Sequence, residues 1–370
     1  MAGHDAFRIA VLPGDGIGVE VMEVCLAVLE RLQRRVGGFG LACERLPGGA
    51  QLYRDTGVAF PKASMDACER ADAILFGAMG SPDARHADGT EIAPQLELRS
   101  GLDLYAGVRP IRAIPGVPLP LADPRAGDID FVLVREQSEG WFFGRYHPEA
   151  VPPSTDDAAY DLGRTTRKGS ERLFEFAFRL AHQRRARNPA RGRVTCVDKA
   201  NVHRSLALFH RVFWDCAKRH PDIPADHAYV DAMALNLIRK PWAYDVVPTE
   251  NQFGDILSDL AAGLVGGMGM APSGDIGDDH ALFQPAHGTA PDIAGQGLAN
   301  PTAMLLSAAM MLEWLGERHG MPAAVDAARV LERAVDRVFA ERRVRPPDLG
   351  GNDGTASVAG AVAAAIDDRA

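Results

Sequence analysis

The sequence predicts an α/β protein, and two observations support that prediction. Its first third alternates apolar runs with a helical pattern: a strand at Arg8–Leu12, a helix at about Val19–Arg34 and a buried strand at Ala73–Phe76. Glycine turns follow the two strands, at Gly14–Gly18 and Gly77–Ser81. Short apolar strands that alternate with helices and end in glycine turns are typical of a sheet covered by helices.

The remaining chain continues with elements of both kinds, separated by loops. Ile111–Asp128 is rich in proline and glycine, Gly263–Gly274 is a glycine-rich loop and hinge, and Pro346–Gly354 is a loop before a last alanine-rich helix. We expect strands at Phe131–Val134, Val194–Asp198 and Val246–Thr249, and helices at Glu171–Arg187, from about Gln252, and from Asn300 to Leu315.

Size and composition exclude several classes of protein. The chain has 370 residues, enough for about two domains, and its 46% hydrophobic content excludes general disorder. A net charge of −9 argues against a general nucleic-acid or membrane-surface binder. The longest apolar stretch, Met304–Leu312, is too short to span a membrane. We find no secretory signal, and the five cysteines are widely spaced, as in free thiols of a reducing compartment. We therefore expect a cytoplasmic enzyme.

The turn at Gly14–Gly18 is a weak signal for a nucleotide. It reads GxGxG after a strand, whereas the dinucleotide fingerprint is GxGxxG with an acidic residue about 20 positions later. A tight turn between a strand and a helix explains the same glycines equally well.

Asp255 and Asp259 are a stronger signal, because their i, i+4 spacing places both carboxylates on one face of a helix. Like charges at that spacing repel unless a cation lies beside them, and a hard divalent cation prefers oxygen ligands. Asp231, after the strand-like run Ala228–Val230, is a candidate third ligand. The alternative is two solvated surface aspartates, which the flanking Phe253 and neighbouring apolar residues disfavour.

Three arginines and one lysine are candidates for binding and proton transfer. Arg99, Arg109 and Arg135 stand beside or at the end of apolar segments, where a guanidinium can bind a carboxylate bidentately. Three such groups would suit a di- or tricarboxylic acid, although each alone fits an ordinary ion pair. Lys199 ends the strand Val194–Asp198, where it could serve as a general base or simply be a surface lysine.

Together these segments resemble one family over nearly the whole chain: the metal-dependent β-decarboxylating dehydrogenases, which include isocitrate, isopropylmalate, homoisocitrate and tartrate/D-malate dehydrogenases. The segments that resemble it are Leu12–Gly18, Leu102–Pro110, Val134–Glu136, Val197–Asn201, Thr249–Asp259 and His287–Asp292.

The resemblance implies a two-domain isopropylmalate-dehydrogenase-like fold that is not a Rossmann fold. A large cofactor-binding α/β domain would comprise residues 1–104 and 266–370, and a smaller substrate and dimerisation domain would comprise 105–265. The active site would lie in the cleft. Two copies would form a homodimer with shared active sites, in which Lys199 and Asp231 are contributed across the dimer.

The resemblance also implies roles for the site residues. Arg99, Arg109 and Arg135 would bind the malate part of the substrate, and Lys199, assisted by Asp231, would take the hydroxyl proton. Asp231, Asp255 and Asp259 would hold Mg²⁺ or Mn²⁺. Asp292, followed by Ile293, would accept from the ribose hydroxyls and repel a 2′-phosphate, so the expected cofactor is NAD. The other expected cofactor contacts are His287, Gly288, Ala290, Asn300 and Gln284.

Two positions depart from the family pattern. Phe142 stands where relatives have the tyrosine that protonates the enol carbon, and phenylalanine has no proton to give. Tyr146 or water could substitute, or the enzyme could oxidise without decarboxylating. Gln284 stands where many relatives have a glutamate near the nicotinamide.

The substituent at C3 of the substrate would be recognised by Gln95 and Leu96, before Arg99. Isopropylmalate enzymes usually carry adjacent leucines there, and this chain has one of the two. The segments Pro115–Pro118 and Gly127–Phe131 look most like the tartrate/D-malate branch. We expect oxidation of a malate-like acid such as D-malate or tartrate. The alternatives are 3-isopropylmalate or another 3-substituted malate, and a paralogue that binds NAD and a carboxylate with little turnover.

Overall fold

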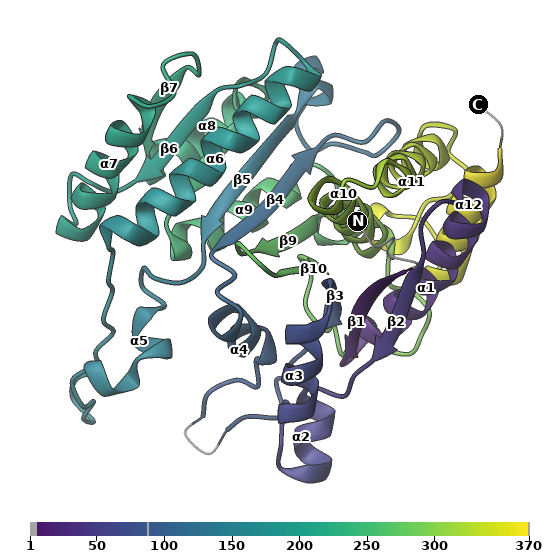
Figure 1. The fold of residues 1–370 in the computed structure, drawn as a ribbon, viewed down its shortest axis with the longest axis horizontal. Helices are drawn as coiled ribbons and strands as arrows, with labels where there is room; N and C mark the ends of the chain where they lie inside the picture. The colour runs from purple at the N-terminus through teal and green to yellow at the C-terminus, as the bar shows by residue number, and fades with distance from the viewer. Residues whose placement is uncertain (1–5, 87–88, 369–370) are drawn as a thin grey trace. The chain divides into compact units, whose positions relative to one another are not determined.

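The computed structural model describes residues 6–86 and 89–368, and the chain forms two compact units (Figure 1). The first unit contains residues up to Leu102, Ile114–Pro120 and Val265 onward; the second contains Asp103–Ala113 and Leu121–Leu264. The sequence did not lead us to expect that the short segment Ile114–Pro120 would return to the first unit.

The first unit is a sheet with the strand order β2-β1-β3-β10-β9, in which β9 and β10 are antiparallel and the other neighbours are parallel. Its strands are β1 (Phe7–Gly14), β2 (Leu41–Arg45), β3 (Ala73–Ala78), β9 (Pro272–Ile276) and β10 (Ala281–Pro285). Its helices are α1 (Ile17–Val36), α2 (Ala50–Thr56), α3 (Lys62–Arg70), α4 (Pro94–Gly101), α10 (Thr302–His319), α11 (Pro322–Ala340) and α12 (Thr355–Asp367).

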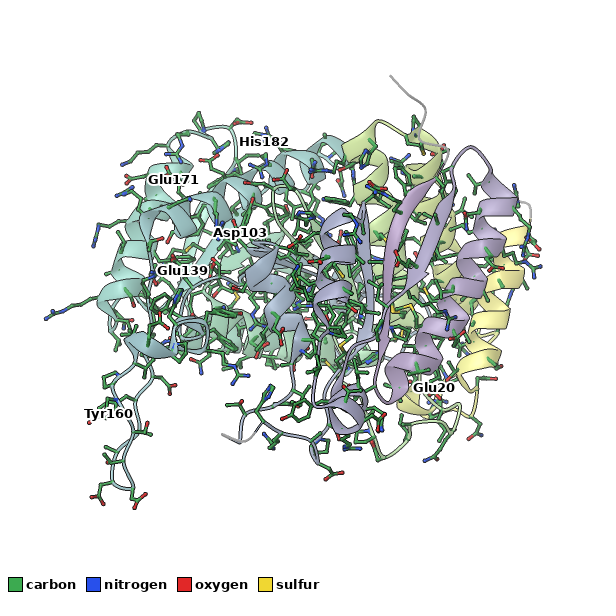
Figure 2. All side chains as sticks on the ribbon, turned by 60° about the horizontal axis from the view of Figure 1, so that its bottom comes forward. Glu20, Asp103, Glu139, Tyr160, Glu171 and His182 are labelled. Atoms are coloured by element: carbon green, nitrogen blue, oxygen red, sulfur yellow. The ribbon has the colours of Figure 1, made fainter. Side chains whose placement is uncertain are left out.

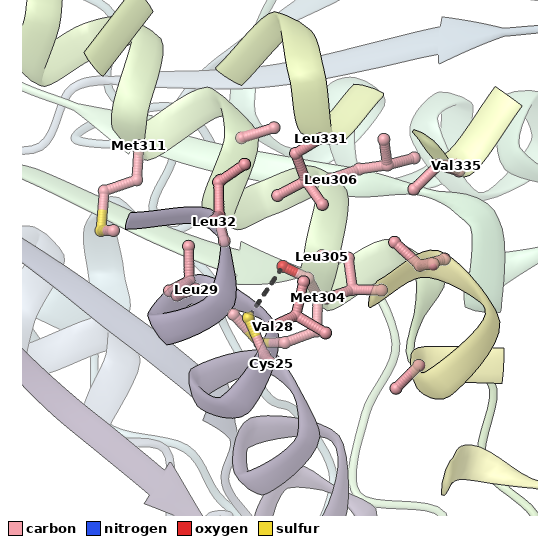
Figure 3. Close-up of a cluster of buried hydrophobic side chains, with 14 of the residues drawn as sticks. Cys25, Val28, Leu29, Leu32, Met304, Leu305, Leu306, Met311, Leu331 and Val335 are labelled. Atoms are coloured by element: carbon pink, nitrogen blue, oxygen red, sulfur yellow. Dashed lines mark hydrogen bonds between the residues drawn. The ribbon is translucent and has the colours of Figure 1, made fainter. Parts of the chain in front are cut away.

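The core of the first unit lies between this sheet and α1, α10, α11 and α12. Helix α10 is buried on nearly all sides, as its all-round apolar sequence predicts. Figure 3 shows where α1 meets α10: the Cys25 thiol lies 3.9 Å from the carbonyl oxygen of Met304, among Val28, Leu29 and Leu305. The two ends of the chain therefore share one core.

The second unit has the strand order β4-β5-β8-β6-β7, parallel except for the antiparallel pair β4 and β5. Its strands are β4 (Ala106–Arg112), β5 (Asp130–Glu136), β6 (Val194–Asp198), β7 (Ala225–Tyr229) and β8 (Val246–Thr249). Its helices are α5 (Phe143–Tyr146), α6 (Arg167–Arg187), α7 (Arg204–Ala217), α8 (Val230–Arg239) and α9 (Asn251–Gly263). Buried phenylalanines join α6 to α7; the ring centroids of Phe174 and Phe209 are 4.5 Å apart.

The turn at Gly14–Gly18 is filled by the protein's own backbone. A Cβ atom on Gly14 would stand 1.9 Å from the carbonyl oxygen of Ala78, and one on Gly16 would stand 2.1 Å from that of Thr289. The N–H of Ile17, at the start of α1, donates to the same Thr289 oxygen at 2.9 Å. The glycines thus allow close packing of chain segments.

Among the described residues, no helix combines the length and the apolar character that a membrane crossing requires.

Candidate active site

Arg135 connects the end of β5 to the helix that carries the predicted metal ligands. Its Nε and Nη2 donate to Oδ1 of Asn251 at 3.0 and 2.8 Å, and its Nη1 pairs with Asp255. A Cβ on Gly254 would stand 2.6 Å from Arg135 Cγ, so glycine at this position of α9 lets the arginine lie against the helix. The guanidinium is buried and held from two directions.

Asp255 and Asp259 lie one turn apart on α9, as the spacing predicts. The Asp255 side chain is 54% exposed, although it pairs with a buried arginine. Burial raises the pKa of Asp259, and the neighbouring charge of Asp255 raises it further, whereas the Arg109 and Arg135 guanidinium groups oppose this rise. Two carboxylates and two guanidinium groups therefore interact in the second unit. Such a pair favours a bound cation.

Lys199 and Asp231 form a second pair. Lys199 directly follows β6, and its Nζ donates to Asp231 Oδ1 at 2.7 Å. This hydrogen bond lowers the pKa of Asp231. Asp231 stands in the first turn of α8, which starts at Val230, one position after β7 ends at Tyr229. The lysine and the carboxylate that the family resemblance links are thus in contact within one chain.

The three aspartates predicted as metal ligands do not form one group within a single chain. Among the described His, Cys, Asp and Glu side chains, one group of three has ligand atoms that all lie within 4.8 Å of one another. Its members are Asp198, His210 and His227. Asp231 thus contributes to no such group with Asp255 and Asp259. This arrangement is consistent with a ligand set that two copies of the chain share.

The Asp198 group is better explained as an anchor for the Lys199 loop than as a metal site. Asp198 Oδ1 accepts from the N–H of Ala200 at 2.8 Å, immediately after Lys199. Trp214 Nε1 donates to His210 Nε2 at 3.1 Å, so the proton of this imidazole resides on Nδ1, which faces Asp198 Oδ2 at 3.0 Å. A protonated Nδ1 donates a hydrogen bond and cannot ligate a metal.

Phe142, at the predicted proton-donor position, contacts the substrate-binding candidate Arg135. The guanidinium carbon of Arg135 lies 5.2 Å from the centroid of the Phe142 ring. One turn later, the hydroxyl of Tyr146 donates to the carbonyl oxygen of Gln137 at 3.4 Å. The ring is therefore beside the arginine that would hold the substrate, but it carries no hydroxyl.

In the first unit, Gln95 and Arg99 lie on the same face of α4, one turn apart. Gln95 Oε1 is buried and has no hydrogen-bond partner. Arg99 is buried, and its Nε donates to Oδ2 of Asp275 on β9 at 2.8 Å. Gln284 Nε2 donates to the same oxygen at 3.0 Å. Sequence reasoning missed Asp275, because one acidic residue in a glycine-rich segment carries no motif.

The predicted cofactor loop has the features of a ligand site. His287 Nδ1 lies 2.9 Å from the Gly288 carbonyl oxygen, while its Nε2 is buried without a partner, and burial lowers the pKa of this imidazole. Apart from its chain neighbours, no described atom lies within 4 Å of the place a Gly288 Cβ would take, and Ala290 has a φ of +38°. The unpartnered Nε2 makes this loop a candidate ligand site, and its role in binding NAD stays a prediction. Asp292 is exposed at the end of this loop.

Asn300 is bonded within the protein. Its Oδ1 accepts from the N–H and hydroxyl of Thr302 at 3.1 and 2.7 Å, which satisfies the start of α10, and its Nδ2 donates to Asp348 at 3.1 Å. The structure therefore gives Asn300 a structural role at the end of the loop, and a role in binding NAD stays a prediction.

Comparison with known proteins identifies the family. The model of the isocitrate/isopropylmalate dehydrogenase family matches residues 8–362. The chain belongs to the isocitrate/isopropylmalate dehydrogenase family. It is 42% identical over 358 residues to the 3-isopropylmalate/3-methylmalate dehydrogenase of Methanocaldococcus jannaschii, covering 96% of this chain and 98% of that protein. It is 38% identical over 364 residues to a probable tartrate dehydrogenase/decarboxylase of Agrobacterium vitis, covering 97% and 98%.

A solved structure in the same family confirms the fold. The crystal structure of isocitrate dehydrogenase from Methylococcus capsulatus matches with a TM-score of 0.85 and 36% identity, over 98% of this chain and 100% of that chain. The predicted fold class is confirmed, and the protein is an oxidoreductase that acts on a CH–OH group.

Glu136, next to Arg135, generates a prediction about pH. Glu136 is buried, and burial raises its pKa from the usual 4.5 to about 7, although N–H groups of Ser138 and Glu139 donate to it. Between these two pH values the folded protein binds the proton more tightly than the unfolded chain. The free energy of unfolding should therefore fall by about 3 kcal/mol as pH rises through this window, and then level off.

The glutamine introduced by Glu136→Gln cannot ionise. The free energy of unfolding of this variant should therefore not fall as pH rises through this window. Urea unfolding at pH 4.5 and pH 8 would measure it, with Glu69→Gln at an exposed position of α3 as the control. If Glu136→Gln retains the wild-type difference between the two pH values, Glu136 is not the group that titrates.

Proposed function

We propose that this protein is an NAD-dependent, divalent-metal-dependent dehydrogenase that oxidises and β-decarboxylates a malate-like 2-hydroxy acid such as D-malate or tartrate. The observation that carries the proposal is the group of charges on β4, β5 and α9. There, the guanidinium groups of Arg109 and Arg135 act on the carboxylates of Asp255 and Asp259. Paired guanidinium groups bind substrate carboxylates, and paired carboxylates bind a hard cation.

The chain's own residues account for binding and proton transfer. Arg109 and Arg135 would hold the substrate carboxylates in the second unit, and Arg99 would add a third contact. Lys199 Nζ would take the hydroxyl proton, and the Asp231 carboxylate, 2.7 Å away, would stabilise the resulting ammonium. Bound Mg²⁺ or Mn²⁺ would supply a Lewis acid at the hydroxyl and carboxylate oxygens, and NAD would accept the hydride.

Gln95 supports a polar substituent at C3. Its Oε1 is a buried acceptor without a partner, one turn before Arg99. A hydroxyl on C3, as in tartrate, would satisfy this atom, whereas an isopropyl group would leave it unpaired. Leu96 provides an apolar side chain beside Gln95. Relatives at similar identity include both a 3-isopropylmalate/3-methylmalate dehydrogenase and a probable tartrate dehydrogenase/decarboxylase, so 3-isopropylmalate is the runner-up substrate.

The cofactor loop supports NAD over NADP. Asp292 is exposed where the ribose hydroxyls are expected, and a second negative charge from a 2′-phosphate would be repelled. His287 Nε2 is a buried nitrogen available for the adenosine.

A homodimer would complete the metal site. Leu235 and Ile238 on α8 and Ile256 on α9 are 55%, 46% and 61% exposed, an apolar surface on the helices that carry the metal-ligand candidates. Figure 2 shows the segment around Tyr160, itself 51% exposed, projecting from its own unit. A second copy covering this surface would bring its Lys199 and Asp231 to Asp255 and Asp259.

The first prediction from this proposal concerns activity. With Mn²⁺ and NAD, D-malate or a tartrate should yield NADH with a kcat/KM at least about tenfold above that of 3-isopropylmalate, isocitrate and homoisocitrate. NADP should be a poor substitute. EDTA should abolish the signal, and Asp255→Asn should lower kcat by about 100-fold or more, because a ligand charge is lost.

Asp215→Asn on α7, a partly exposed aspartate that also pairs with an arginine, is the control and should retain wild-type rates. Full activity in EDTA would contradict metal dependence. If none of these hydroxy acids yields NADH, the result would favour the paralogue that binds NAD and a carboxylate with little turnover.

The second prediction concerns Phe142. A phenol at this position would lie beside Arg135 and could protonate the enol carbon after CO₂ is lost, so Phe142→Tyr should raise kcat by about tenfold without lowering the ratio of CO₂ released to NADH formed. Tyr146→Phe tests the alternative donor. If Phe142→Tyr leaves kcat unchanged and Tyr146→Phe lowers it, Tyr146 is the proton donor.

The third prediction concerns assembly. Light scattering should give twice the chain mass, and a double change of Ile256 and Leu235 to glutamate should yield monomers without NADH production, because buried charges oppose association. Val58→Glu, at an exposed apolar position of the first unit, is the control. An active monomeric wild type would refute the shared site.

A further inference from the structure

We infer that Asp275 is a positioning residue of this active site, holding Arg99 and Gln284 in the orientations that substrate and cofactor require; this rests on the proposed function. Asp275 lies in β9 and is fully buried. Its Oδ2 accepts from Arg99 Nε at 2.8 Å and from Gln284 Nε2 at 3.0 Å. One oxygen atom thus joins an expected substrate-binding side chain to an expected cofactor-binding side chain.

The strand register explains why these side chains meet. In the antiparallel pair of β9 and β10, Asp275 is opposite Leu282, and Gln284 is opposite Ser273. Asp275 and Gln284 are therefore diagonal neighbours on one face of the sheet. Arg99 reaches this face from the last turn of α4, and its side chain is only 8% exposed. A guanidinium this deeply buried requires a carboxylate nearby.

For Arg99, the contact determines the plane of the guanidinium. The Nε–H is one of its five donors, and the group is planar, so fixing this edge orients the four terminal N–H bonds as well. A guanidinium that is already oriented binds a carboxylate without first losing its rotational freedom. Asp275 should therefore contribute to substrate affinity without touching the substrate.

For Gln284, the hydrogen bond to Asp275 determines the orientation of the side-chain amide. Because Nε2 donates to Asp275, Oε1 points away from that carboxylate. This residue then presents an acceptor at the position where the nicotinamide is expected. Among Arg99, Asp275 and Gln284, the negative charge lies on Asp275 in β9, whereas Gln284 in β10 is neutral.

The exchange variant Asp275→Asn/Gln284→Glu gives a sharp test. It returns the same negative charge to the neighbouring strand, and the amide introduced on β9 can still accept from Arg99 and donate to the new carboxylate on β10. Asp275→Asn alone removes the charge. Asp245→Asn is the matched control: Asp245 is buried, and its Oδ1 accepts from Arg184 Nε at 2.6 Å in the second unit, the same kind of pair outside the candidate site.

KM and kcat for the hydroxy acid, and NADH binding by fluorescence titration, should be measured for all variants. Asp275→Asn should raise the KM for the hydroxy acid about tenfold and weaken NADH binding about fivefold. The exchange variant should recover both to within about threefold of wild type. Asp245→Asn should lower the Tm and leave both within about twofold of wild type.

Three outcomes would overturn the inference. The first is Asp275→Asn lowering the Tm while KM and NADH affinity stay at wild-type values, as in the control. The second is an exchange variant that folds and recovers neither. The third is a wild type that binds no NADH.

If Asp275→Asn does not fold, Gln284→Met replaces it. This change leaves the Arg99–Asp275 pair in place and should weaken NADH binding with little change in the KM for the hydroxy acid; equal effects on both, or none, would overturn the inference. A wild type that produces no NADH from any hydroxy acid would refute the proposed function alone, because NADH titration still decides the role of Asp275.

Discussion

The arrangement of the candidate site depends on the repulsion between the carboxylates of Asp255 and Asp259. Two carboxylates one helical turn apart destabilise a helix unless cations lie close by. Arg135 meets this need by lying against α9, which in turn requires glycine at position 254 and an acceptor at Asn251. Burial nevertheless raises the pKa of Asp259, and the neighbouring Asp255 carboxylate raises it further.

Pairing with a carboxylate recurs at two further candidate site residues. Lys199 is held by Asp231, and Arg99 is held by Asp275. In each pair, the carboxylate restricts the orientation of a basic side chain that would meet substrate. Ion pairs of this kind contribute little net stability when they are buried, because desolvation offsets the attraction. These pairs act by orienting the basic side chain. A variant that keeps the total charge and exchanges the positions of the acid and the amide is therefore more informative than one that removes the acid.

Much of this could be predicted from the sequence, for physical reasons that differ between elements. Val194–Asp198 and Val246–Thr249 were predicted with the observed bounds because short apolar strands between turns leave few alternatives. The first three residues of strand β9, Pro272–Gly274, were expected to belong to a loop, since glycine and proline obscure the strand period. Asp275, the next residue, carried no prediction. The i, i+4 spacing predicted the shared face of Asp255 and Asp259, whereas the path of Arg135 onto that face depends on a contact between residues about 120 positions apart, which no local pattern encodes.

Hydrogen-bond satisfaction differs among the residues expected to contact substrate and cofactor. Asn300 was expected to contact adenosine, but its oxygen and nitrogen are both bonded within the protein. By contrast, Gln95 Oε1 and His287 Nε2 are buried and unpaired. Leaving such an atom unpaired costs about 1–3 kcal/mol, a cost that a ligand bound there would remove. Eight further described side chains also carry a buried atom without a hydrogen-bond partner, so position selects these two: Gln95 lies a turn from a substrate arginine, and His287 lies in the predicted cofactor loop.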